Sequence, residues 1–328
     1  MANYNNGQYI QEAIESVIHQ TLSDWELLIV DDGSTDDSVN RIKEYLSDRR
    51  ITLIRNSANK GKVLSLIDLV TESKAGIFGV LDSDDVLKKE ALSIMYEEHL
   101  KHYDCGLIYS QFLFCNNNLD QICEGFCRKI PNGETNLRSI YSSAFRTFKK
   151  DSYNKTEGYN EKFIYGQDRD IVFKMEEVTN LFFVDKILYK HRVLSDSISN
   201  DPKKKLLGRL LLIKAQYDAF SRRLQTPIPN LTNKEMSLEL FVASVILFYL
   251  KRRGDAIKHF KLAITLNRTL FFSVINYSFN KVISRIIRLF FIKDNELSSI
   301  YSKVNIDLKR QSNEISFEYP MINKIKNL

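Results

Sequence analysis

Three carboxylates lie close together in the segment Asp82-Ser83-Asp84-Asp85. They follow an apolar run, Ile77 to Leu81, whose length and flanking residues are typical of a buried β-strand. A strand that ends in acids places them at the carboxyl edge of a sheet, where open α/β folds bind ligands. Because crowded carboxylates repel one another, a cation stabilises their charged form. The segment therefore predicts a site for Mg²⁺ or Mn²⁺, completed by the phosphates of a substrate.

A solvated acidic turn is the simpler interpretation of the same residues. In that interpretation Asp85 is the N-cap of the helix that follows, and no metal ion is needed. The segment alone does not separate these two hypotheses. The elements around it, and further motifs along the chain, have to decide between them.

Helical and strand patterns alternate around this acidic segment. Apolar residues at helical or strand spacing predict a helix over 9–20, a strand over 25–30, a helix after Asp36, a strand over 51–54, a helix over 63–70 and the strand over 77–81. In the next helix Leu92, Met95 and His99 are expected to face inward. This alternation favours a parallel sheet with helices on both faces.

Composition and charge limit the class of protein. The 328 residues are 44% apolar, enough for one large α/β domain with an appendage, and no run approaches the ~20 apolar residues of a membrane span. The four cysteines lie between 105 and 127 without a paired C-x2-C spacing, so we interpret them as reduced thiols of a cytosolic protein.

The net charge of +6 hides an asymmetry between the two parts of the chain. Residues 1–200 carry 24 Lys and Arg against 31 Asp and Glu, whereas residues 201–328 carry 23 against 10. The acidic part suits a metal-assisted site, and the basic part suits an anionic surface. No recognisable nucleic-acid module accompanies the basic part, so a membrane surface is the better partner.

Several short motifs, in a fixed order, resemble family 2 glycosyltransferases of the GT-A fold, bacterial type. The resemblance covers about residues 1–200 and is carried by Asp31-Asp32-Gly33-Ser34 and the acidic segment 82–85. Further matching motifs lie at 2–5, 19–21, 59–61, 144–146, 158–161, 167–170 and 197–199. The resemblance implies an α/β nucleotide-diphospho-sugar transferase fold, a Rossmann-like mixed sheet with helices on both faces. Residues 1–200 would form this catalytic domain, and residues 201–328 a basic helical region.

The resemblance also implies roles for single residues. Tyr4 and Asp31 match positions that hold the nucleotide base, by stacking and by a carboxylate hydrogen bond. Asp82 and Asp84 match the D-x-D motif that binds the metal ion and the donor diphosphate. Asp168 matches the catalytic base. Each role suits its residue type, because hard oxygens suit Mg²⁺ and a partly desolvated carboxylate can accept a proton.

Some positions depart from the family pattern. Leu66-Ile67 stands where an Arg-Asn pair often helps to hold the donor, and Gln167 replaces the usual glutamate before the base. Arg192 is kept as a donor-binding residue of the Y-R-x-H segment. However, Leu194 stands at the histidine of that segment, and His191 lies three residues earlier.

The region after residue 200 has a different character. Lys203-Lys204-Lys205 opens a leucine-rich helix, and the run 270–292 is apolar with Lys281, Arg285 and Arg288 on one helical face. Such a helix either lies in a membrane interface or packs on the catalytic domain. The sequence leaves both interpretations open.

Together these features predict an inverting, metal-dependent glycosyltransferase. A sugar would pass from a nucleotide-diphosphate donor, uridine-linked, to an acceptor hydroxyl in cell-envelope polysaccharide or glycan synthesis. Mg²⁺ or Mn²⁺ would neutralise the departing diphosphate. The acceptor would be a glycan or a lipid-linked sugar, and the basic region would hold a cytoplasmic enzyme at the inner face of the cell membrane.

Two alternatives belong to other classes. A GT-A-fold nucleotidyltransferase would need a glycine-rich, basic triphosphate loop near its N-terminus, which Gly7 alone does not supply. A non-catalytic glycan-binding or scaffold protein would need neither a metal site nor a base, so Asp82, Asp84 and Asp168 count against it.

The start of the chain falls inside a motif of the family. Met1 stands where the first β-strand should end, so most of that strand is missing from the sequence given. In a doubly wound sheet this strand is central and positions the ligand loop. We therefore expect that the functional chain begins upstream, with an apolar stretch of about six residues.

Overall fold

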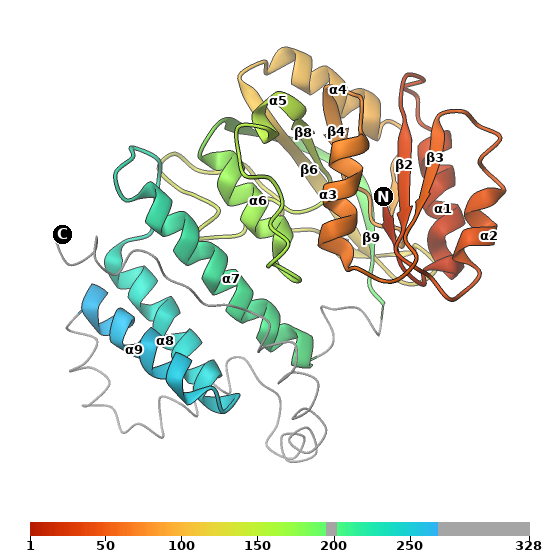
Figure 1. Ribbon diagram of the computed structural model, residues 1–328. Helices are drawn as coiled ribbons and strands as arrows, with labels where there is room; N and C mark the ends of the chain where they lie inside the picture. The colour runs from red at the N-terminus through yellow and green to blue at the C-terminus, as the bar shows by residue number, and fades with distance from the viewer. Residues whose placement is uncertain (195–201, 268–328) are drawn as a thin grey trace. The chain divides into compact units, whose positions relative to one another are not determined.

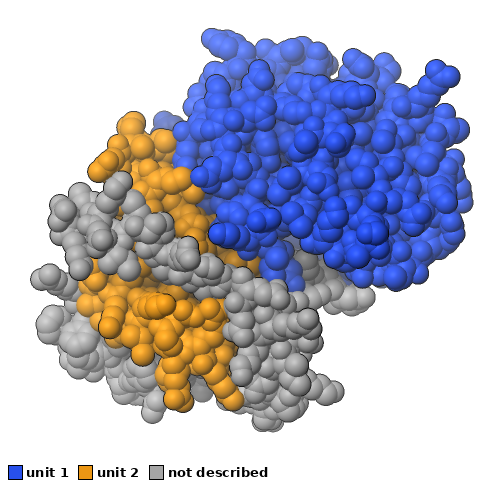
Figure 2. Space-filling model, in the orientation of Figure 1, with its two compact units in different colours: residues 1–195 blue, residues 196–328 orange. Residues whose placement is uncertain are grey.

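The computed structural model describes residues 1–194 and 202–267 of the chain. The chain divides into two compact units, residues 1–195 and residues 196–328 (Figure 2). The expected interfacial helix over 270–292 lies outside the described residues.

The N-terminal unit begins with a small parallel sheet of strand order β1-β2-β3 (Figure 1). Its strands are β1 (Ala2–Asn3), β2 (Leu27–Asp31) and β3 (Ile51–Arg55). Helices α1 (Gly7–Ile18), α2 (Ser38–Lys43) and α3 (Lys62–Glu72) alternate with them. The predicted alternation is confirmed here, because α1 buries its apolar stripe and α3 packs on β1 and β2.

A second, mixed sheet of six strands completes the unit. Its strand order is β4-β8-β6-β9-β5, and β7 pairs with β6. The strands are β4 (Ile77–Gly79), β5 (Val86–Leu87), β6 (Cys105–Cys115), β7 (Gln121–Glu124), β8 (Arg146–Lys149) and β9 (Asn180–Arg192). Among the described strands of this sheet, only β6 and β9 pair in parallel, so the expected parallel sheet is observed for β1 to β3 and was wrong here. The mixed sheet implied by the resemblance is observed.

The strand before the acidic segment is shorter than predicted. β4 ends at Gly79, two residues before Leu81, and pairs antiparallel with β8. Its residues are half-buried or exposed, while Leu81 itself is buried. The acids therefore follow a short irregular segment that begins at Val80.

Three more helices cover this sheet. They are α4 (Ala91–Lys101), α5 (Lys150–Tyr153) and α6 (Gln167–Glu176). His99 faces inward from α4, as predicted, and its Nε2 lies 2.9 Å from Thr147 Oγ1. Burial lowers the pKa of His99 to about 4, so this imidazole is a neutral core residue at neutral pH.

A buried ion pair fixes the first turns of α6. The Lys174 ammonium lies 2.7 Å from Asp170 Oδ2, and both side chains are almost completely buried. The same ammonium donates to the carbonyl oxygen of Gly158 at 2.9 Å. The lysine thus ties the helix to the segment that precedes it.

The described part of the second unit is helical. It comprises α7 (Pro202–Arg223), α8 (Asn233–Tyr249) and α9 (Arg253–Leu266). A capping box between Thr232 and Glu235 begins α8, and Ser237 Oγ donates to the Ala263 carbonyl at 2.7 Å, which joins α8 to α9. Among the described residues, no helix is both long and apolar enough to cross a membrane.

Candidate active site

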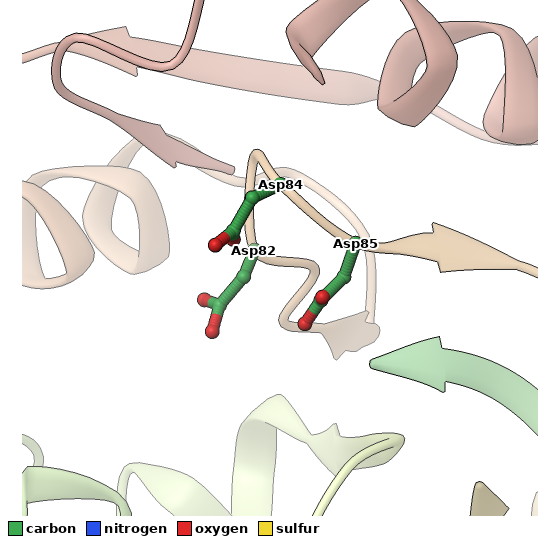
Figure 3. A group of neighbouring side chains, drawn as sticks. All are labelled: Asp82, Asp84 and Asp85. Atoms are coloured by element: carbon green, nitrogen blue, oxygen red, sulfur yellow. The ribbon is translucent and has the colours of Figure 1, made fainter. Parts of the chain in front are cut away.

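The acidic turn between β4 and β5 gathers three carboxylates (Figure 3). Oxygen atoms of Asp82, Asp84 and Asp85 all lie within 4.8 Å of one another. Figure 3 shows the Asp82 and Asp84 carboxylates turned to the same side, with Asp85 set apart from them. Asp82 and Asp84 are half-buried and Asp85 is buried, so two acids are accessible and the third is not.

Asp85 anchors the turn to strand β9. Its Oδ1 accepts a hydrogen bond from the Arg192 backbone N–H at 2.7 Å, and its Oδ2 accepts one from the Tyr189 hydroxyl at 2.7 Å. His191 Nδ1 also lies 3.0 Å from Oδ2. The N-cap hypothesis for Asp85 was wrong, because β5 follows directly and the next helix begins at Ala91.

Asp82 is paired with a lysine from α3. Lys62 Nζ lies 2.7 Å from Asp82 Oδ1, and both side chains are about one-third exposed, at 39% and 34%. The start of α3 is held by Asp32, which accepts hydrogen bonds from the backbone N–H groups of Lys60 at 3.0 Å and Gly61 at 2.8 Å. This fixed helix start determines where the backbone of Lys62 lies.

The charges around the turn shift the pKa values of Asp82 and Asp84 in opposite directions. Burial, together with repulsion by Asp85 and Asp82, raises the pKa of Asp84 to about 6. Burial also acts to raise the pKa of Asp82, but attraction by Lys62 outweighs it and the pKa of Asp82 is lowered. Among the described residues, no side chain donates a hydrogen bond to the Asp84 carboxylate. Its need for a cation and its hard oxygens fit Mg²⁺ or Mn²⁺.

Asp168 lies in the first turn of α6 and is 42% exposed. Arg146 holds it from β8, because its Nη1 donates to the Asp168 carbonyl at 3.0 Å and its Nη2 lies 3.5 Å from the carboxylate. Burial lowers the pKa of Lys62, yet attraction by Asp82, with smaller contributions from Asp84 and Asp168, raises it overall. The candidate catalytic base, Asp168, and the candidate metal ligands therefore attract the same ammonium group.

The residues expected to bind the nucleotide base lie at the ends of β1 and β2. Asp31 is buried; its Oδ1 accepts from Asn3 Nδ2 at 2.9 Å and its Oδ2 from the Ser34 backbone N–H at 3.1 Å. Tyr4, by contrast, is 44% exposed. The loop after Tyr4 reaches the acidic turn, since Asn6 Nδ2 donates to Ser83 Oγ at 2.8 Å.

Arg192 is buried beneath the acidic turn. Its Nε donates to the Asp84 carbonyl at 2.8 Å, its Nη2 lies 3.0 Å from a Glu12 carboxylate oxygen, and its Nη1 donates to the Asn117 carbonyl. The guanidinium also lies over the Tyr9 ring, 4.5 Å from its centroid. All three guanidinium nitrogens thus have protein acceptors. Through these contacts Arg192 positions the acidic turn.

Several residues of this site were not assigned a role from the sequence. Lys62, Asn6 and Tyr189 carried no recognisable pattern, because their partners lie 20 to 107 positions away. Arg146 lay inside a matching motif, but nothing local indicated that it holds Asp168. The one available signal was the position of Lys62 directly after Gly61, at a helix start next to the site.

Two solved structures share this fold. Staphylococcus aureus TarS in complex with UDP gives a TM-score of 0.54 at 14% identity, over 83% of this chain and 90% of that chain. The Pyrobaculum calidifontis mannosyltransferase PcManGT, in complex with GDP-Man and Mn²⁺, gives 0.50 at 13%, over 87% and 82%. These likenesses confirm the expected glycosyltransferase fold of GT-A type, followed here by helices.

Sequence likeness defines the family. The chain is 31% identical over 195 residues to the chondroitin synthase of Escherichia coli, across 58% of this chain and 28% of that protein. It spans 20–28% of the length of the first polysaccharide synthases that it matches. The model of glycosyl transferase family 2 matches residues 1–156. Residues 1–156 are therefore the part of the chain that matches glycosyl transferase family 2.

Proposed function

We propose that the chain is an inverting glycosyltransferase of cell-envelope polysaccharide or glycan synthesis. It would transfer a sugar from a nucleotide-diphosphate donor, uridine-linked, to an acceptor hydroxyl. The observation that carries the proposal is the cluster of Asp82, Asp84 and Asp85, whose carboxylate oxygens lie within 4.8 Å of one another. Residues 1–200 would form the catalytic domain. Membership of family 2 over residues 1–156 supports the reaction class.

The chain's own residues supply the binding and the proton transfer. Tyr4 is exposed and can stack on the nucleotide base, which Asp31 at the adjoining strand end would help to hold. Asp168 accepts the proton of the acceptor hydroxyl. The oxygen of the acceptor hydroxyl then bonds to the anomeric carbon while the bond from that carbon to the diphosphate oxygen breaks. One base and one displacement invert the configuration of the sugar, in contrast to double displacement by a carboxylate nucleophile.

Asp82 and Asp84 would hold Mg²⁺ or Mn²⁺, and Asp85 would keep the turn in place. The ion would supply positive charge for the departing diphosphate. Arg192, which the resemblance assigns to donor binding, would support that function by holding the backbone of Asp84.

Metal-dependent donor binding tests the proposal. In calorimetric titrations the native chain should bind UDP in the presence of Mn²⁺ and bind it much more weakly without the ion. Asp84→Ala should reduce the Mn²⁺-dependent affinity for UDP by about 10-fold or more, because it removes one of two accessible carboxylate ligands.

Asp24→Ala is the matched control, because Asp24 is an exposed carboxylate in the segment before β2, outside the acidic turn. It should bind UDP and Mn²⁺ like the native chain. If the native chain shows no metal-dependent binding of UDP or another nucleotide diphosphate, the proposed function is wrong and a glycan-binding role gains support.

The helical unit has the charge expected of a surface for anionic lipid. Residues 202–267 contain 13 Lys and Arg against four Asp and Glu. Near the turn between α8 and α9 the cations of 251–261 are joined by two exposed apolar side chains, Phe248 and Ile257, at 57% and 54%. Apolar and basic groups together suit a lipid interface, where each cation contributes about 1 kcal/mol. We propose that this surface holds a cytoplasmic enzyme near a membrane-proximal acceptor.

Sedimentation with liposomes tests this surface. The chain should bind vesicles containing anionic lipid, and less so as salt rises. Reversing two exposed charges, Lys258→Glu with Lys261→Glu, should weaken that binding by about 30-fold or more. Lys186→Glu, an exposed site on β9, is the control. Equal binding to neutral vesicles, or no effect of the double variant, would contradict the proposal.

A further inference from the structure

Lys62 already neutralises the carboxylate that is expected to bind the metal ion. Its ammonium lies 2.7 Å from Asp82 Oδ1, in hydrogen-bond contact with an accessible side chain. The more distant charges of Asp84 and Asp168 attract the same ammonium. A metal ion at Asp82 and the Lys62 ammonium would therefore compete for one carboxylate.

The position of Lys62 is fixed at its backbone and free at its end. Asp32 holds the helix start through the N–H groups of residues 60 and 61, while the four-carbon side chain of Lys62 is 39% exposed. Leu66, one turn further along α3, is buried and apolar and brings no charge to this end of the site. A flexible cation on a fixed stem can leave one anion for another at short range.

We propose that Lys62 is an exchangeable counter-ion. In the free protein it neutralises Asp82. When Mg²⁺ or Mn²⁺ binds to Asp82, the ammonium is released from that carboxylate and pairs with the diphosphate of the donor, the new anion at the site. This inference rests on the proposed function, and it assigns to Lys62 opposite effects on the binding of the two ligands.

The test is to measure both ligands with Lys62→Met. Mn²⁺ alone, titrated by calorimetry, should bind about 3- to 10-fold more tightly than to the native chain, because a competing cation is gone. UDP at saturating Mn²⁺ should bind about 10-fold more weakly, because a charged partner of the diphosphate is gone. The control is Lys60→Met in the same turn, whose ammonium lies 3.5 Å from Asp68; it should change neither affinity by more than about 2-fold.

The affinities for Mn²⁺ and for UDP are expected to change in opposite directions, which distinguishes this proposal from a purely structural role. An unchanged affinity for Mn²⁺, or a loss of both affinities, would overturn the exchange and leave Lys62 as a residue that only supports the turn. In an Asp82→Asn background the gain in Mn²⁺ affinity should vanish. Lys62→Gln, which keeps a hydrogen-bond donor without the charge, repeats the test should Lys62→Met unfold early. If the native chain binds neither Mn²⁺ nor UDP, the proposed function fails first.

Discussion

Replacing Asp168 with asparagine should lower the rate of sugar transfer by about 10²- to 10⁴-fold, the usual loss for a well-placed general base. The amide is nearly the same size and keeps an oxygen that can accept from Arg146, so the local structure should persist. It cannot accept the proton of the acceptor hydroxyl. The affinity for UDP in Mn²⁺ should therefore stay within about 3-fold, and kcat rather than KM for the donor should carry the loss.

The control for this variant is Asp185→Asn, which removes an exposed carboxylate from β9. It should transfer sugar at the native rate. Native activity in Asp168→Asn would show that another group accepts the proton. A large loss of UDP affinity would instead place Asp168 in donor binding.

Replacing Lys174 with methionine should destabilise the N-terminal unit by about 3–5 kcal/mol, because it leaves the Asp170 carboxylate buried without its cation. Against a typical total of ~5–15 kcal/mol this is a large loss. Urea unfolding followed by tryptophan fluorescence measures it. Trp25 is the only tryptophan of the chain and lies in this unit, so the signal reports on the right part.

Two further variants define the cause. Combining Lys174→Met with Asp170→Asn should recover much of the stability, since the buried charge that has lost its lysine is then removed. Lys101→Met breaks an exposed pair with Glu98 and should change the stability by less than about 1 kcal/mol. A small effect of Lys174→Met alone would mean that Asp170 is protonated or solvated. Asp168 and Asp170 thus lie two positions apart. Asp168 is expected to affect the rate of sugar transfer, and Asp170 the stability of the fold.

The sequence predicted the local features of this fold well. α1 and β2 were predicted within a few residues, because their apolar spacing reflects burial on one face or in a sheet. The inward position of His99 followed from the same periodicity. The acids of the D-x-D segment were recognised because they are adjacent in sequence.

Features that depend on distant pairing were not predictable in the same way. β4 was expected to continue to Leu81 in a parallel sheet, but β8, almost 70 residues later, pairs with it antiparallel. Nothing near residue 77 encodes that partner. The same reason explains the missed contact of Lys62 with Asp82 and the wrong hypothesis that Asp85 caps a helix. Donor and acceptor roles stay predictions for the experiments described above.

The anchoring of Asp85 to β9 has a consequence for the order of assembly. Its partners Tyr189, His191 and Arg192 lie 104 to 107 positions further along the chain. A ribosome delivers the acidic segment first, and contacts of such high contact order form slowly because a long loop must close. Until β9 has emerged, the three carboxylates lack the hydrogen bonds that orient Asp85 and the backbone of Asp84. A nascent chain therefore carries the acids of the site well before it has an ordered ion-binding geometry.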